Sequence, residues 1–214
     1  MTDESRYPVP DLPLGGRFQI EETIRRSRFI ATAARASTPE EAKAFIDEIR
    51  AEHSQATHNC WAYAAGAPGD TARVGASDDG EPKGTAGRPM LTAILHGGVG
   101  ETVVVVTRYF GGILLGTGGL VRAYQGTTKA VLEALPTKPR EVFVRYVASL
   151  DPTISANFEH VLREAGGKVL STDFRFDAAY EILVPEDAAV RFESLVHSIS
   201  GGEALLDRQE ELAS

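Results

Sequence analysis

The run "ETVVVVTRYF", residues 101–110, constrains the fold of this chain more than any other segment. It carries consecutive valines and is free of glycine and proline. β-Branched side chains fit a pleated strand, and an uninterrupted apolar run is typical of a strand that is covered on both faces. We therefore expect residues 101–110 to form a central, doubly buried strand.

The segments before this run predict alternating strands and helices. Residues 17–26 and 28–37 are typical of two strands joined by a turn around Ser27. Residues 37–53 predict a helix, because Ser37 or Thr38 can cap its first turn and apolar residues recur on one face. Further elements are expected as strands at 58–66 and 71–77 and a short helix at 88–98.

The segments after it predict a second domain. A helix at 120–135 ends before Pro136, and the Pro-rich, charged residues 136–140 are typical of a linker. From residue 141 the pattern is strand, helix, strand, strand, helix, strand, as in ferredoxin-like domains. We therefore expect an α+β protein with a flexible lead-in (1–16), a first α+β domain (17–135), a linker (136–140) and a ferredoxin-like domain (141–214).

The composition favours a cytoplasmic protein. Cys60 is the single cysteine, so the chain has no internal disulfide, as expected in a reducing compartment. The N-terminus lacks the basic start and apolar core of a secretory signal, and no apolar run approaches the ~20 residues that span a bilayer. We expect no membrane partner, and the sequence does not predict an oligomeric state.

Charge is unevenly distributed along the chain. The formal net charge of −8 argues against a general attraction to nucleic acid, and the acidic residues concentrate after residue 177. Residues 82–132 are basic by contrast, with Glu101 opposing a set of cations. These cations are Lys83, Arg88, Arg108, Arg122 and Lys129. They form either a solvated face or an anion-binding surface on the first domain.

A glycine-rich turn, "GGILLGTGG", lies between the central strand and the following helix. Its spacing and its lack of lysine match neither a P-loop nor a dinucleotide-binding motif. Backbone N–H groups of such a turn can still hold a phosphate or an RNA backbone between Arg108 and Arg122. The alternative is that the glycines permit a sharp turn and close packing. They are Gly111, Gly112, Gly116, Gly118 and Gly119.

The loop "SDDGEPKGTAGRP", residues 77–89, concentrates polar side chains. Asp78, Asp79 and Glu81 could act as acid, base or ligands of a hard cation, but their spacing lacks the pattern of a calcium loop and Lys83 competes for their charge. A salt-bridged turn is the favoured interpretation. Other members of this loop that could approach a ligand or shape the turn are Gly84, Thr85, Gly87 and Arg88.

Other candidate groups carry alternatives. His53, His58 and Cys60 suggest a metal site or, preferably, a packed histidine beside a buried cysteine. A serine–histidine–acid triad is disfavoured because no histidine is near Ser77 in sequence. The rings of Tyr109, Phe110 and Tyr124 could stack on bases, with core packing at least as good an explanation for Phe110. We predict no catalytic residue, metal or cofactor.

Three segments, "HNCWAY", "SDDGEPKGTAGRP" and "VVVTRYFGGILLGTGGLVRAY", together resemble the IMPACT family in the layout of its bacterial YigZ-like members. The resemblance covers residues 17–135, and the tail from Glu141 fits the second domain of bacterial members. It implies a first domain like those of ribosomal proteins and elongation factors, and a second domain like the last domain of elongation factor G. It also implies an association with translation, and bacterial members have been suggested to bind nucleic acid.

Together these observations favour a translation-associated regulatory protein that binds RNA or the ribosome. We expect phosphate contacts from Lys83, Arg88, Arg108 and Arg122, stacking or shape recognition by Tyr109 and Tyr124, and backbone approach at the glycines. One alternative is an enzyme acting on a small phosphorylated or peptide substrate with Asp78, Asp79 and Glu81. Another is a protein-interaction module without a small ligand.

Overall fold

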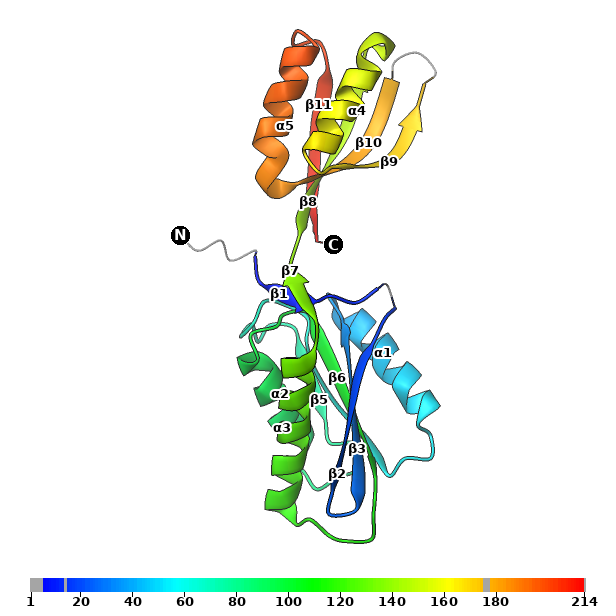
Figure 1. The fold of residues 1–214 in the computed structure, drawn as a ribbon, viewed down its shortest axis with the longest axis vertical. Coiled ribbons are helices and arrows are strands. Elements are labelled where there is room, and N and C mark those ends of the chain that lie inside the picture. The colour runs from blue at the N-terminus through cyan, green and yellow to red at the C-terminus, as the bar shows by residue number, and fades with distance from the viewer. Residues whose placement is uncertain (1–5, 14, 175–177, 214) are drawn as a thin grey trace. The chain divides into compact units, whose positions relative to one another are not determined.

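The computed structural model describes residues 6–13, 15–174 and 178–213. The chain divides into two compact units, Met1–Pro139 and Arg140–Ser214 (Figure 1). Within the described residues, no helix has the length and apolar character needed to cross a membrane.

The first unit is built on a five-stranded antiparallel sheet with the order β2-β3-β6-β4-β5. Strand β6 lies in the middle, and its residues from Thr102 to Arg108 are all buried, which confirms the predicted central strand. The strands are β2 (Phe18–Ile24), β3 (Ser27–Arg35), β4 (His58–Ala64), β5 (Val74–Ser77) and β6 (Thr102–Tyr109).

Helices cover both faces of this sheet (Figure 1). The valines of β6 alternate between the two faces. Val103 and Val105 pack with α1 (Pro39–Glu52), whereas Val104 and Val106 pack with the other two helices. Thr38 caps α1 by accepting a hydrogen bond from the Glu41 N–H at 3.2 Å, as the sequence predicted. The helices of the opposite face are α2 (Gly87–His96) and α3 (Thr117–Ala134).

The hairpin turn between β2 and β3 differs from the prediction. It lies at Arg25 and Arg26, whose φ angles are +46° and +66°, and not around Ser27. Ser27 is instead the first residue of β3 and is fully buried. A polar residue is accommodated there because its hydroxyl accepts hydrogen bonds from Arg108 and from the Gly111 N–H.

The N-terminal lead-in and the linker also differ from the prediction. Strand β1 (Pro8–Pro10) pairs antiparallel with β7 (Thr137–Pro139), so part of each segment forms a small two-stranded sheet. Val9 is completely buried, and this burial holds a segment that its proline content suggested would be flexible. The lead-in residues 1–5 and 14 lie outside the described part of the chain.

The second unit has the predicted order of strand, helix, strand, strand, helix, strand. Its antiparallel sheet has the order β11-β8-β10-β9. Alternate residues of β10 are buried, and the buried set packs with aromatic residues such as Phe158 and Phe192 of the two helices. The elements are β8 (Val142–Leu150), a short 3-10 turn η1 (Pro152–Ile154), α4 (Ser155–Glu164), β9 (Lys168–Asp173), β10 (Ala178–Pro185), α5 (Glu186–Ile199) and β11 (Leu205–Ala213).

Candidate functional site

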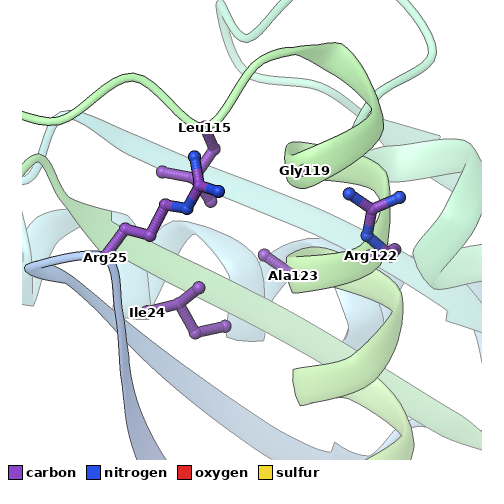
Figure 2. Close-up of a pocket in the computed structure, with 6 residues that line it drawn as sticks. All are labelled: Ile24, Arg25, Leu115, Gly119, Arg122 and Ala123. Carbon is purple, nitrogen blue, oxygen red and sulfur yellow. The ribbon is translucent and has the colours of Figure 1, made fainter.

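A pocket with two arginines lies between the β2–β3 turn and the start of α3 (Figure 2). Its volume is about 320 Å³, and Arg25 and Arg122 flank Gly119 and Ala123 in the view. The lining residues that the structure describes are Ile24, Arg25, Leu115, Gly119, Arg122 and Ala123, and they include no acidic side chain. The pocket therefore presents positive charge with no carboxylate in its wall to neutralise it.

The first turn of α3 adds to this positive character. Gly116 precedes the helix and offers no side chain to cap it, so the N–H groups of the first turn have no side-chain acceptor. Gly118 and Gly119 lie in that turn. Helix N-termini carry partial positive charge, which favours an anion at this end of α3.

Arg25 and Arg26 were missed in the sequence-based list of cations. Both are exposed at the tip of the hairpin, next to the glycine-rich turn. Neither residue is of a type that favours positive φ, so only their place between two segments with strand patterns indicates a turn there. Of the predicted cations, Arg122 lines the pocket, whereas Lys83 and Arg88 are exposed but are not among its lining residues.

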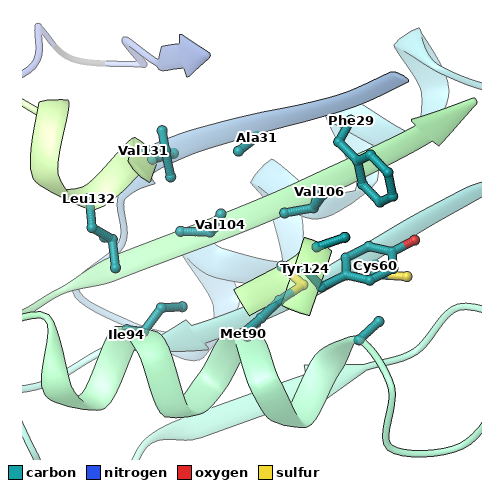
Figure 3. Close-up of a cluster of buried hydrophobic side chains, with 14 of the residues drawn as sticks. Phe29, Ala31, Cys60, Met90, Ile94, Val104, Val106, Tyr124, Val131 and Leu132 are labelled. Carbon is teal, nitrogen blue, oxygen red and sulfur yellow. The ribbon is translucent and has the colours of Figure 1, made fainter. Parts of the chain in front are cut away.

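Glu81 organises a buried polar network within the first unit. Its Oε1 atom accepts hydrogen bonds from Arg108 Nη1 at 2.6 Å and from the Tyr124 hydroxyl at 2.8 Å. Figure 3 shows Tyr124 within the core, beside Cys60 and Met90. Because Glu81 belongs to the polar loop, Arg108 to β6 and Tyr124 to α3, the network ties three elements together.

This network corrects two predicted roles. Arg108 is only 5% exposed, its guanidinium is bonded to Glu81 and Ser27, and it lies between the rings of Phe29 and Phe110. Arg108 therefore belongs to a structural ion pair and is not an accessible phosphate ligand. Tyr124 is completely buried and cannot stack on a base. Burial raises the pKa of its phenol, so the hydroxyl remains a hydrogen-bond donor to Glu81.

The two aspartates of the polar loop are likewise committed to internal bonds. Asp78 accepts backbone N–H bonds from Gly84, Ala86 and Gly87 at 2.7, 2.9 and 2.9 Å. Burial acts to raise the pKa of Asp78, but the three N–H donors outweigh it and hold the pKa below its usual value.

Asp79 bonds to Arg50 at 2.6 Å and to the Asn59 N–H at 2.7 Å. Its φ of +42° marks a tight turn there. In the part of the chain that is described, no group of three or more histidine, cysteine, aspartate or glutamate side chains is placed to hold a metal ion.

His58 and Cys60 support the same loop from β4. The His58 Nδ1 atom lies 2.8 Å from the Asp79 carbonyl oxygen, and the Cys60 thiol donates to the Asp78 carbonyl oxygen at 3.0 Å. Burial raises the pKa of the Cys60 thiol well above its usual value. These contacts hold backbone carbonyl groups and give neither residue a metal-binding arrangement.

Tyr109 and His53 form a separate contact at the end of β6. The Tyr109 hydroxyl lies 3.0 Å from His53 Nδ1, and the guanidinium of Arg28 lies over the tyrosine ring at 5.2 Å. Tyr109 is half-buried, and Arg28 already covers one face of its ring.

The glycines and Thr85 have different structural tasks. A Cβ atom on Gly111 would lie 1.9 Å from the Arg26 carbonyl oxygen, so the glycine allows the turn to pack on the hairpin tip. A Cβ atom on Gly87 would lie 2.7 Å from the backbone of Ser77, so the absence of a side chain there lets the start of α2 approach β5. Thr85 is buried and donates to the Pro82 carbonyl oxygen at 2.6 Å. The remaining glycines of the two loops, Gly80, Gly84 and Gly112, have positive φ angles.

The loop after β6 exposes apolar side chains. Phe110 is 44%, Ile113 38% and Leu114 82% exposed. Phe110 is therefore not part of the core, which disagrees with core packing, the explanation considered at least as good as base stacking for this ring. The exposed ring and the basic pocket both adjoin the glycine-rich turn.

The model of the Impact N-terminal domain matches residues 25–132. The chain belongs to the IMPACT family. It is YigZ-like: the family member YigZ of Escherichia coli (strain K12) is 40% identical over 192 residues, covering 90% of this chain and 94% of that protein.

Two further similarities span most of the chain. The IMPACT family member YvyE of Bacillus subtilis (strain 168) is 37% identical and covers 86% of this chain and 84% of its own length. A crystal structure described as that of a hypothetical protein has a TM-score of 0.73 at 37% identity, covering 96% of this chain and 98% of its own. The two-unit architecture is thus shared with a solved structure.

Proposed function

We propose that this IMPACT family protein binds RNA through the arginine surface, defined as Arg25, Arg26 and Arg122. The observation that carries the proposal is the pocket wall, in which two exposed arginines and the start of α3 meet without a carboxylate. Arginine forms bidentate bonds with phosphate oxygens, and phosphate contacts supply most of the affinity for a nucleic acid backbone.

The chain as a whole carries a net charge of −8, so this binding is local. An acidic protein with a confined basic surface is expected to bind only where that surface meets the polyanion. Lys83 and Arg88 are exposed in the same unit and extend the proposed phosphate contacts beyond the pocket.

The geometry favours RNA binding over the enzymatic alternative. Asp78, Asp79 and Glu81 are each bonded within the chain, so none is free to act as a general acid, a general base or a metal ligand without breaking a structural contact. The arginine surface in contrast is solvent-exposed.

Fold analogy supports a setting in translation. The family resemblance implies that the first unit is similar to α+β domains of ribosomal proteins and elongation factors, and that the second is similar to the last domain of elongation factor G. The element order of the second unit is that of ferredoxin-like domains. Fold alone does not fix function, so the analogy supplies the setting and the arginine surface supplies the interaction. The proposed partner is ribosomal RNA, free or within the ribosome, in the cytoplasm.

The test is co-sedimentation of the purified protein with ribosomes and with free ribosomal RNA across a salt series. The doubly substituted Arg25→Ala/Arg122→Ala protein should lose binding, whereas Arg163→Ala, which removes an exposed arginine of α4, should retain it. Absence of binding by the unaltered protein at low salt would contradict the proposal. Equal loss in both variants would indicate non-specific charge attraction and would also count against it.

A further inference from the structure

Phe110 presents an aromatic ring at the surface beside the hairpin tip. It is 44% exposed, and the guanidinium carbon of Arg108 lies over the ring at 5.4 Å from its centroid. The charge of this arginine is already paired with Glu81. The ring is therefore covered on one face by a buried cation that is paired with Glu81, and 44% of the residue remains exposed to solvent.

The backbone around this ring is fixed on two sides. The Phe110 N–H donates to the Thr57 hydroxyl at 3.0 Å, and the Gly111 N–H donates to the Ser27 hydroxyl at 3.3 Å. Gly111, the residue after Phe110, packs tightly against the Arg26 carbonyl oxygen, so the ring lies near the hairpin turn that carries Arg25 and Arg26. A backbone held in this way leaves only the side-chain torsions of Phe110 to be ordered when a ligand packs on the ring.

The neighbouring charges indicate what kind of ligand suits the ring. Arg25 and Arg26 are exposed at the tip that Gly111 contacts, so a ligand on Phe110 meets positive charge close by. An anionic polymer with flat faces satisfies both features. A nucleic acid strand offers phosphates to the arginines and a base to the ring.

We infer that the RNA bound here is single-stranded, with one unstacked base packed on Phe110; this rests on the RNA binding proposed above. In a duplex the bases are paired and stacked, and their faces are closed to a side chain. A splayed base in a loop or single strand exposes its face and can stack on an aromatic ring, whatever its identity. The site thus distinguishes single-stranded from double-stranded RNA more than it distinguishes one base sequence from another.

The test compares short oligouridylate RNA with the same strand annealed to oligoadenylate, by fluorescence anisotropy at low salt. Oligouridylate should bind more tightly than the duplex. Stacking of one base predicts that Phe110→Ala weakens oligouridylate binding by about 5- to 150-fold and leaves duplex binding unchanged. Phe110→Trp should keep the affinity, and oligouridylate should quench the emission of the new tryptophan more than it quenches Trp61 in the unaltered protein.

The matched control is Leu114→Ala, which removes a more exposed apolar side chain of the same loop that has no ring. It should leave oligouridylate affinity unchanged. Equal binding of the two RNAs, or equal loss in Leu114→Ala and Phe110→Ala, would overturn the stacking inference while RNA binding stands. A Phe110→Ala protein that loses ribosomes but keeps oligouridylate would assign the ring to a protein contact and also overturn it. Failure of both RNAs to bind would instead overturn the proposed function.

Discussion

Arg108 Nη1 lies 2.6 Å from Oε1 of Glu81, and the two side chains are only 6% and 3% exposed. The ion pair joins the polar loop to β6, and Glu81 also accepts a hydrogen bond from the Tyr124 hydroxyl of α3. A buried pair of charges is costly to assemble, but removal of one partner leaves the other charged and without compensation in the interior.

We therefore expect Arg108→Ala to lower the free energy of unfolding by about 3–5 kcal/mol. The matched control is Arg28→Ala, because Arg28 forms an ion pair with Glu21 at 2.9 Å in which both side chains are 50% exposed. An exposed pair of this kind contributes about 1 kcal/mol or less. Urea denaturation measures both values, and a similar small loss in the two variants would show that the buried pair is not structural.

Asp78 gives the polar loop a stability that depends on pH. Because its folded-state pKa lies below the unfolded value of about 3.9, its contribution is complete above that value and is lost as the pH falls through the folded pKa. Asp78→Asn should cost about 1–3 kcal/mol at pH 7, since it weakens three N–H bonds to a charged acceptor. The difference from the unaltered protein should shrink in acid. Asp47→Asn, at an exposed position of α1, serves as control, and a difference for Asp78→Asn that stays constant with pH would contradict the assignment.

Substitution of glycine by alanine should have opposite effects on stability at Gly111 and at Gly126. Gly111→Ala places a Cβ atom 1.9 Å from the Arg26 carbonyl oxygen and must push the turn away from the hairpin, so it should destabilise the protein and weaken RNA binding. Gly126→Ala lies within α3 with open space around the added atom and should stabilise the helix by about 0.5–1 kcal/mol. Thermal unfolding compares the two, and loss of stability in both would show that the contact at Gly111 is not the cause.

Cys60 provides a reporter of local opening. Its thiol is completely buried and its pKa is raised, so the reactive thiolate is scarce in the folded protein. We expect an aromatic disulfide reagent at pH 8 to react with Cys60 slowly in the native protein and rapidly in urea. Arg108→Ala should accelerate the native reaction, because it loosens the loop whose Asp78 carbonyl accepts the thiol hydrogen bond. Rapid modification of the native, unaltered protein would contradict this burial.

Much of the fold could be predicted because local patterns coincide with it. The valines of β6 alternate between two covered faces, and Thr38 caps α1 as its position suggested. Short-range patterns failed where distant contacts decide the outcome. Val9 is buried through the pairing of β1 with β7, which joins segments from opposite ends of the first unit. The proline content of each segment alone indicated flexibility.

The site was less predictable than the fold. Arg108 has the composition and position of a phosphate ligand, but its partner Glu81 lies 27 residues away in the chain and only the folded sheet brings the two together. Arg25 and Arg26 became candidates once the turn was located between β2 and β3. Sequence could indicate that this region is basic, but it could not separate the buried arginine from the exposed ones.

The salt dependence of RNA affinity tests the central claim most directly. The dissociation constant for oligouridylate would be measured over a salt series for the unaltered protein, Arg25→Ala, Arg122→Ala and the control Arg163→Ala. If each pocket arginine contacts a phosphate, the slope of log affinity against log salt should lessen by about 0.7 in each of the first two variants and remain unchanged in the control. Slopes that stay the same in Arg25→Ala and Arg122→Ala would contradict the assignment of RNA binding to the arginine surface.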